Sequence, residues 1–198
     1  MTEQNVKSCL LCGVGGQGTV LASRIIAAAA MEKGLRAKTA ETIGMAQRGG
    51  SVVSHVRTGM QIPSPMIPKG KADILIGFEP GEAAKNIEYL KENGTLILCA
   101  QEVKPITASL GQSGYDGDTC IAYLRGKIPK CYVIDTGRII EACGNPKVLN
   151  VAVVGALCAS GEMGLSIEDV DRALEIKLKP KVLDVNKQAL RMGAACIK

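Results

Sequence analysis

The stretch CGVGGQGTVLASRIIAAAAMEKGLRAKTAE, residues 12–41, decides the fold class. It contains the pattern G-x-G-x-x-G, whose three glycines are Gly13, Gly15 and Gly18. A continuous apolar run comes before the glycines, and an Ala-rich segment ending at Gly34 follows them. An alternating segment then ends on Glu41, where a ribose-binding carboxylate would stand. The order predicts a strand, a glycine loop, a helix and a second strand, which is a βαβ opening.

The rest of the chain continues this pattern of strands and helices. We predict strands at 51–59, 72–79, 95–100 and 131–136, and helices at 80–94, 118–127, 147–159, 167–178 and 181–193. Residues 61–71 contain three prolines and should form an extended surface segment. The prediction is one domain over residues 1–198, a three-layer α/β fold of Rossmann-like type. Its sheet should be mostly parallel and its last third helical.

Length, composition and charge limit the classes of protein that this chain can belong to. With 198 residues, 46% of them hydrophobic, the chain can bury a sizeable core. It has no apolar run of membrane-spanning length and no signal-peptide pattern, so we expect a soluble cytoplasmic protein. The net charge of +5 could suit nucleic acid, but aromatic residues are 3% and Trp is absent. A basic excess without stacking residues favours an anionic small molecule or protein partner over nucleic acid or a membrane.

The cysteines argue against a metal site on this chain. Of the eight, only Cys9 and Cys12 are closely spaced, and they belong to the apolar run predicted to be a strand. Residues three apart in a strand point to opposite faces, so these two thiols cannot readily share a metal. Iron–sulfur ligation needs tighter runs of cysteine, which the sequence lacks. We predict no metal ligands and no catalytic residues here.

The glycine loop has two interpretations. A strand that turns sharply into a helix aims free backbone N–H groups at a ligand, and the helix dipole favours an anion there. Alternatively, the glycines only allow helix, strand and loop to pack closely. A dinucleotide site fits poorly, because after Glu41 the chain enters TIGMAQRGG (42–50) instead of a helix and a third parallel strand. Glu41 could instead accept backbone hydrogen bonds.

Three sequence blocks in order are more specific than the glycines. They are GVGGQGTVLASRI, ETIGMAQRGGSVVSHVRTG and SPMIPKGKADILIGFEPGEA, and GNPKVLNVAVVGAL extends the similarity more loosely toward the C-terminus. Together they resemble the gamma-type subunit of the 2-oxoacid:ferredoxin oxidoreductases. Within that family the chain is most similar to the small (beta) subunits of the indolepyruvate type.

The resemblance implies a chain that works only inside a complex. A large (alpha) subunit would hold thiamine diphosphate with Mg and iron–sulfur clusters of the 4Fe–4S type. That complex decarboxylates an arylpyruvate, passes the acyl fragment to coenzyme A and gives the electrons to ferredoxin. The gamma-type domain would cover the large subunit and help form the coenzyme A site. Isolated, the chain could self-associate through its uncovered face.

The resemblance also implies where coenzyme A would be contacted. Carried over to this sequence, the residues are Gly13, Gly15, Gly16, Gln17, Gly18, Thr19, Gln47, Arg48, Gly49 and Gly50. The guanidinium of Arg48 could bind a phosphate, pair with a nearby carboxylate or contact the partner subunit. We expect the only histidine, His55, to be structural, and Asn150 to hydrogen-bond between helices. Two other functions stay open: a free-standing NAD(P)-binding oxidoreductase and a nucleotide-binding regulatory module.

Overall fold

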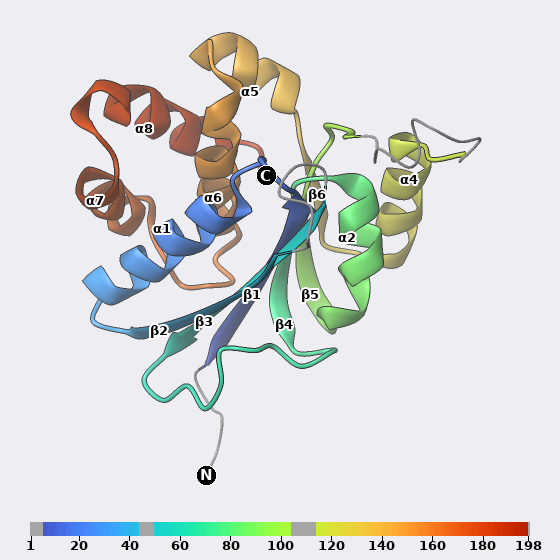
Figure 1. Cartoon of the computed structure of the whole chain (residues 1–198), viewed down its shortest axis with the longest axis horizontal. Coiled ribbons are helices and arrows are strands. Elements are labelled where there is room, and N and C mark those ends of the chain that lie inside the picture. The colour runs from blue at the N-terminus through green and yellow to red at the C-terminus, as the bar shows by residue number, and fades with distance from the viewer. Residues whose placement is uncertain (1–5, 44–49, 104–113, 198) are drawn as a thin grey trace.

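A computed structural model describes residues 6–43, 50–103 and 114–197, and shows a sheet with helices on both faces (Figure 1). The strands are β1 (Lys7–Val14), β2 (Arg36–Ile43), β3 (Ser51–Gly59), β4 (Ala72–Gly77), β5 (Leu90–Cys99) and β6 (Cys131–Ile134). The helices are α1 (Thr19–Glu32), α2 (Pro80–Asn86), α4 (Gly117–Lys127), α5 (Thr136–Cys143), α6 (Leu149–Ser160), α7 (Ile167–Lys177) and α8 (Pro180–Ala194). Two short 3₁₀ turns are η1 (Ile87–Tyr89) and η2 (Pro146–Val148).

The sheet is mixed but mostly parallel. Its strand order is β2-β3-β1-β4-β5-β6, and the ladders from β1 through β4 and β5 to β6 are parallel. Strand β3 runs antiparallel to both β1 and β2, so β2 has the same direction as β1. The predicted βαβ opening is therefore present, but β3 lies between its two strands. Neighbouring strands are about 4.8 Å apart, so β2 lies about 9.6 Å from β1 instead of next to it.

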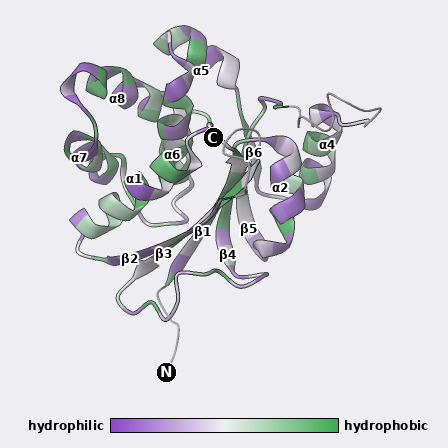
Figure 2. Ribbon diagram, viewed as in Figure 1, coloured by the Kyte–Doolittle hydropathy of each residue, from purple (hydrophilic) through white to green (hydrophobic). Residues whose placement is uncertain are grey.

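Two apolar cores confirm the three layers. On one face, α1 and the C-terminal helices pack on the sheet through side chains such as Leu11, Ile25 and Val153. On the other face, α2 and α4 pack through Ala83 and Leu124. Helix α6 is buried from Leu149 to Cys158 and is largely green in Figure 2, because it lies between the sheet and the other C-terminal helices. The predicted helical last third is confirmed.

The alternation of a strand separates the two closely spaced cysteines as predicted. Cys9 belongs to the core beneath α1, and Cys12 belongs to the core beneath α2. Both side chains are fully buried, and burial raises the pKa of each thiol well above its usual range. They pack as small apolar groups.

One predicted helix is wrong in length. Helix α2 ends at Asn86, the η1 turn follows, and β5 already begins at Leu90, so Gly94 lies within a strand and does not end a helix. The parallel pairing of β5 with β4 is irregular just before Ile74, which accommodates the extra residues of β5. A Cβ on Gly94 would lie 2.5 Å from Cδ1 of the buried Leu90. Burial of Leu90 therefore overrides the helical preference of the preceding residues.

Candidate functional site

The glycine loop turns β1 into α1 through two left-handed residues. Gly16 has φ +102° and Gly18 has φ +87°, a region that L side chains rarely adopt. Gly13 serves close packing instead, because a Cβ there would lie 2.8 Å from Cβ of Phe78. A Cβ on Gly16 would meet no atom of the described residues within 4 Å, so these residues leave the tip of the loop open. Gly13 thus fits the packing interpretation, whereas the loop tip at Gly16 leaves room for a ligand.

Gln17 fixes the shape of this loop. Its Oε1 accepts a hydrogen bond from the Val14 N–H at 2.7 Å, and its Nε2 donates to the Phe78 carbonyl at 3.0 Å. The side chain therefore ties the end of β1 to the residue that follows β4. Thr19 is buried at the start of α1.

The two glycine-rich segments meet in space. The N–H of Gly15 donates to the carbonyl of Gly50 at 2.9 Å. Of the second segment, Gly50 is described, whereas Gln47, Arg48 and Gly49 lie outside the described residues. The contact therefore supports a shared site for the two segments through Gly50 alone.

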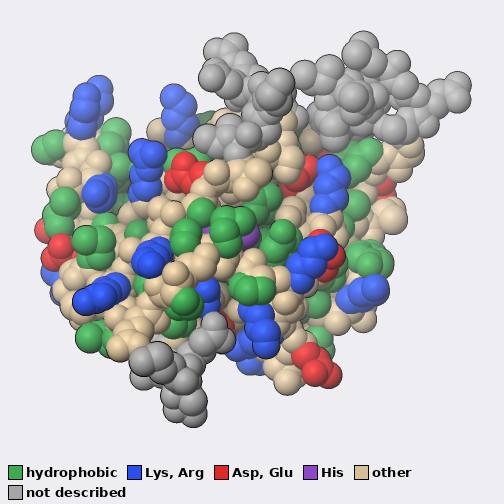
Figure 3. Space-filling model, turned by 60° about the horizontal axis from the view of Figure 1, so that its bottom comes forward, with side chains coloured by type: hydrophobic (Ala, Val, Ile, Leu, Met, Phe, Trp, Pro, Cys, Tyr) green, Lys and Arg blue, Asp and Glu red, His purple; other side chains and the backbone are tan. Residues whose placement is uncertain are grey.

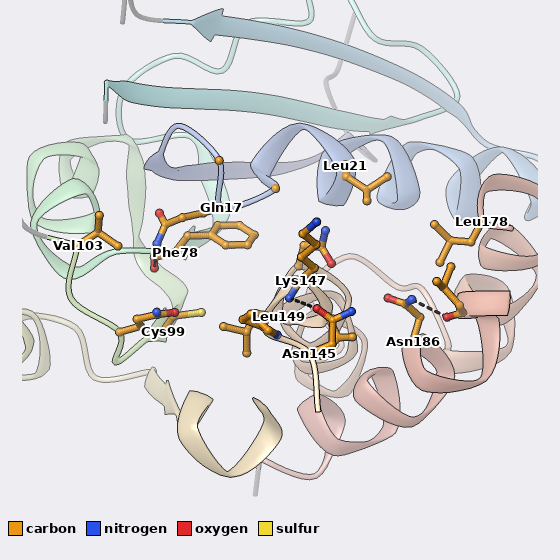
Figure 4. Close-up of a pocket in the computed structure, with 17 residues that line it drawn as sticks. Gln17, Leu21, Phe78, Cys99, Val103, Asn145, Lys147, Leu149, Leu178 and Asn186 are labelled. Atoms are coloured by element: carbon orange, nitrogen blue, oxygen red, sulfur yellow. Dashed lines mark hydrogen bonds between the residues drawn. The ribbon is translucent and has the colours of Figure 1, made fainter. Parts of the chain in front are cut away.

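A cavity of about 530 Å³ opens beside the loop, at the carboxyl ends of β1, β4 and β5 (Figure 4). Gln17 and Phe78 lie at one end and Leu178 and Asn186 at the other, with Lys147 between them. The apolar lining includes Leu21, Phe78, Val103, Leu149, Leu178 and Val182, and the polar lining is Gln17, Gln101, Asn145, Lys147, Asn150 and Asn186. Helices α1 and α2 leave β1 and β4 toward opposite faces. Ligands of α/β sheets bind at such a switch point.

The electrostatics of the cavity favour an anion. Gly18 caps α1 without a side-chain hydrogen bond, and the first turn of α1 carries no acidic residue. Free N–H groups and the positive end of the helix dipole therefore remain available. Lys147 is exposed at the cavity, and none of the lining residues that the structure describes is Asp or Glu. Burial raises the pKa of the Cys99 thiol to about 12, so this lining residue is no thiolate nucleophile.

Asn150 is the site residue whose position the sequence did not predict correctly. Its side chain is only 7% exposed, and its Oδ1 has no hydrogen-bond partner. A Cβ on Gly18 would lie 2.7 Å from Nδ2 of Asn150, so the amide lies directly beneath the start of α1. The expected hydrogen bond between helices does not form. A buried amide oxygen without a hydrogen-bond partner among the described residues is costly, and Asn150 lines a cavity.

A pair of buried carboxylates organises the neighbouring surface. Glu79 accepts hydrogen bonds from the Glu82 N–H at 2.8 Å and from the Tyr115 hydroxyl. Glu82 accepts from the Ser51 hydroxyl at 2.6 Å and from the Lys85 ammonium at 2.7 Å. Since each carboxylate is satisfied within the protein, we assign the pair to structure. It fixes the start of β3 beside the start of α2.

His55 and Glu41 lie away from the cavity lining. His55 is 2% exposed, its Nδ1 accepts from the Ile67 N–H at 3.2 Å, and its ring meets the Tyr89 ring edge-on. Burial lowers the pKa of His55, so the ring stays neutral as a structural acceptor. Glu41 is on β2, the far side of β3 from the glycine loop. The position that a dinucleotide enzyme gives to its ribose carboxylate is thus occupied by another strand.

The described ranges hold no group of three or more His, Cys, Asp or Glu side chains that could bind a metal. None of the helices in these ranges is long and apolar enough to cross a membrane.

The fold and the cavity define an α/β protein with an anion-favouring site at the switch point of its sheet. Residues 8–196 match the sequence profile of the family described as pyruvate ferredoxin/flavodoxin oxidoreductase, and the chain belongs to this family. It is 42% identical to indolepyruvate oxidoreductase subunit IorB of Archaeoglobus fulgidus over 93% of this chain and 92% of the relative. It is 34% identical to the subunit of the same name from Thermococcus kodakarensis, over 100% and 98%.

Solved structures confirm the fold. The gamma subunit of a keto/oxoacid ferredoxin oxidoreductase from Geobacter sulfurreducens superposes with a TM-score of 0.73 at 22% identity, covering 98% of both chains. A 2-oxoglutarate:ferredoxin oxidoreductase from Magnetococcus marinus, solved with coenzyme A bound, gives a TM-score of 0.72 at 19% identity. The match covers 98% of this chain and 31% of that longer one.

Proposed function

We propose that this chain is the small, non-thiamine subunit of a 2-oxoacid:ferredoxin oxidoreductase that acts on an arylpyruvate such as indolepyruvate. The relatives from Archaeoglobus fulgidus and Thermococcus kodakarensis are named as indolepyruvate oxidoreductase subunits and align over nearly their whole length. In this proposal residues 1–198 form one domain and work in the cytoplasm. The large subunit holds thiamine diphosphate, Mg and the iron–sulfur clusters, and the complex delivers electrons to ferredoxin.

The contribution of this chain is part of the coenzyme A site. The observation that carries the proposal is the uncapped start of α1 beside the buried Asn150, in a cavity whose described lining residues include no Asp or Glu. The free N–H groups at the start of α1 and the ammonium group of Lys147 suit a phosphate of coenzyme A. The apolar wall formed by Phe78, Val103 and Leu149 suits its uncharged arm. The Magnetococcus enzyme of the same fold was solved with coenzyme A, which supports this choice of ligand.

In this proposal the glycines and Gln17 shape the loop that contacts the ligand. Gly16 leaves the loop tip open, and Gln17 holds the loop in register with Phe78. The proposed contacts of Gln47, Arg48 and Gly49 remain predictions, linked to the cavity by the hydrogen bond between Gly15 and Gly50. The two alternatives are a free-standing NAD(P) enzyme and a regulatory module, and neither needs the gene of a large subunit nearby. A gene for a large thiamine- and ferredoxin-type subunit beside this one favours our proposal.

The Asn150→Asp variant tests the site in the assembled enzyme. A carboxylate under the start of α1 would repel a phosphate, so the KM for coenzyme A should rise about tenfold or more, equivalent to about 1.4 kcal/mol. The KM for the 2-oxoacid should stay near that of the wild type. Asn93→Asp, an exposed position at the opposite end of β5, introduces the same charge and should change neither. An equal rise in both constants for Asn150→Asp would show that the cavity does not select coenzyme A.

A further inference from the structure

Residues 60–71 form a strap that links β3 to β4 over the face of the sheet opposite α1. Hydrogen bonds to β3 and to the η1 turn hold it down, and the latter joins the Gly70 N–H to the Glu88 carbonyl at 2.8 Å. The Arg57 Nη1 donates to the carbonyls of Ser64 at 3.1 Å and Met66 at 3.4 Å, and the Ile67 N–H donates to His55. Because buried groups of β3 fix its backbone, the strap presents its outer side chains in a defined arrangement.

The outer side of the strap carries two exposed methionines. Met60 is 61% exposed and Met66 is 47% exposed, although Ile62 and Ile67 of the same segment are buried. In Figure 3, hydrophobic side chains gather in the middle of this face around the only histidine, with Lys and Arg side chains on several sides. Isolated apolar side chains are ordinary on a protein surface, whereas a gathered patch with a polar rim indicates a binding surface. Methionines adapt well to a partner.

The rim of this patch is positively charged. Lys38 of β2 lies opposite Arg57 in the antiparallel register, and Arg36 lies opposite Gly59, so both share the face of the strap. Within the described ranges, neither Lys38, Arg36 nor Lys71 has an acidic side chain at ion-pair distance. The nearby acids are already engaged, since Glu88 pairs with Lys69 and Asp73 pairs with Lys91.

We infer that the strap and the outer face of β2 are the surface on which this subunit docks an acidic, apolar-centred patch of its large subunit. The inference rests on the function proposed above and adds the place and chemistry of contact. Helices α2 and α4 cover the central strands on this face but not β2, so a partner can complete the layer. A second copy would bring the same cations against each other. Nucleic acid would find few aromatic side chains, since they make up 3% of the chain.

Two double variants test the surface, and two further double variants serve as controls. Each is titrated against the cluster-loaded large subunit without air. Met60→Ser with Met66→Ser removes the apolar centre, and Lys38→Glu with Lys71→Glu reverses the rim. Each should raise the Kd about tenfold or more, and added salt should weaken wild-type binding.

Matched controls change exposed residues elsewhere. Met31 and Ile176 are each 62% exposed on other helices, and Arg24 and Lys181 are exposed cations of α1 and α8. Met31→Ser with Ile176→Ser, and Arg24→Glu with Lys181→Glu, should leave the Kd within about twofold of the wild type. Equal melting temperatures would show that all four variants are folded.

Several results would overturn the inference. If the methionine variant and the lysine variant both bind with the Kd of the wild type, the large subunit does not dock on this face. Weaker binding of ferredoxin with normal assembly would assign the face to the electron acceptor instead. A wild-type chain that fails to bind the large subunit at all would overturn the proposed function as well, and so is distinguishable from loss in the strap variants alone.

Discussion

At the scale of single residues, the turn from β1 into α1 depends on glycines with positive φ angles, Gly16 and Gly18. The glycine pattern correctly predicted a strand-to-helix turn, because a positive φ angle such as that of Gly18 strongly favours glycine. The position of Asn150 could not be predicted in this way. Whether a polar residue in an apolar helix meets another helix or a cavity depends on helix packing, which no local pattern encodes.

His55 supplies a prediction about stability and pH. Burial lowers the pKa of this ring from 6.5 in the folded protein, so the unfolded chain binds a proton first as the pH falls. The stabilisation by neutral His55 is complete above pH 6.5 and is lost progressively below it, toward the lower pKa of the folded state. The free energy of unfolding should therefore decrease as the pH falls from about 6.5 toward the lower pKa of the folded state.

The variant His55→Asn keeps an acceptor for the Ile67 N–H but has no group that titrates in this range. Urea unfolding of both proteins across the same pH values should show a shallower dependence for the variant. Identical slopes would mean that His55 does not contribute to the pH dependence.

At the scale of elements, helices α6 and α8 pack closely at two glycines. A Cβ on Gly155 would lie 1.9 Å from the Leu190 carbonyl oxygen, and a Cβ on Gly193 would lie 1.8 Å from that of Ala152. Gly155→Ala should therefore push the helices apart and lower the free energy of unfolding by about 1–3 kcal/mol or more. Gly126→Ala in α4 meets nothing within 4 Å and should be neutral or stabilising by up to about 1 kcal/mol. Chemical denaturation checks both, and equal stabilities would contradict this packing.

The place of β3 leads to a prediction about NAD. Because β3 separates β2 from β1, Glu41 lies one strand further from the glycine loop than a ribose-binding carboxylate next to β1. We expect no binding of NAD(H) or NADP(H) tighter than about 1 mM, or about 4.1 kcal/mol. Calorimetry on the isolated chain tests this, and micromolar affinity would favour the free-standing oxidoreductase. The sequence indicated the departure after Glu41, but strand order depends on long-range pairing that local periodicity does not specify.

At the scale of the whole molecule, the predicted α/β architecture, mostly parallel sheet and helical last third are confirmed. The segment 80–94 was predicted incorrectly, because burial of Leu90 against the sheet outweighed local helix preference. The candidate site was predicted in its loop but not in its floor, which comes from the distant residues Lys147 and Asn150. Sites assembled from separate parts of a chain need the tertiary structure to be found.

The central claim is that this chain completes an enzyme whose redox chemistry belongs to its partner. Oxidative decarboxylation needs an electron sink and a one-electron relay, which cofactors supply. The direct measurement is viologen dye reduction without air by this chain, by the cluster-loaded large subunit and by their mixture. The account predicts no reduction by this chain alone, and reduction by the mixture that requires both coenzyme A and an aryl 2-oxoacid such as indolepyruvate. Reduction by this chain alone, or no gain on mixing when the two subunits bind, would contradict it.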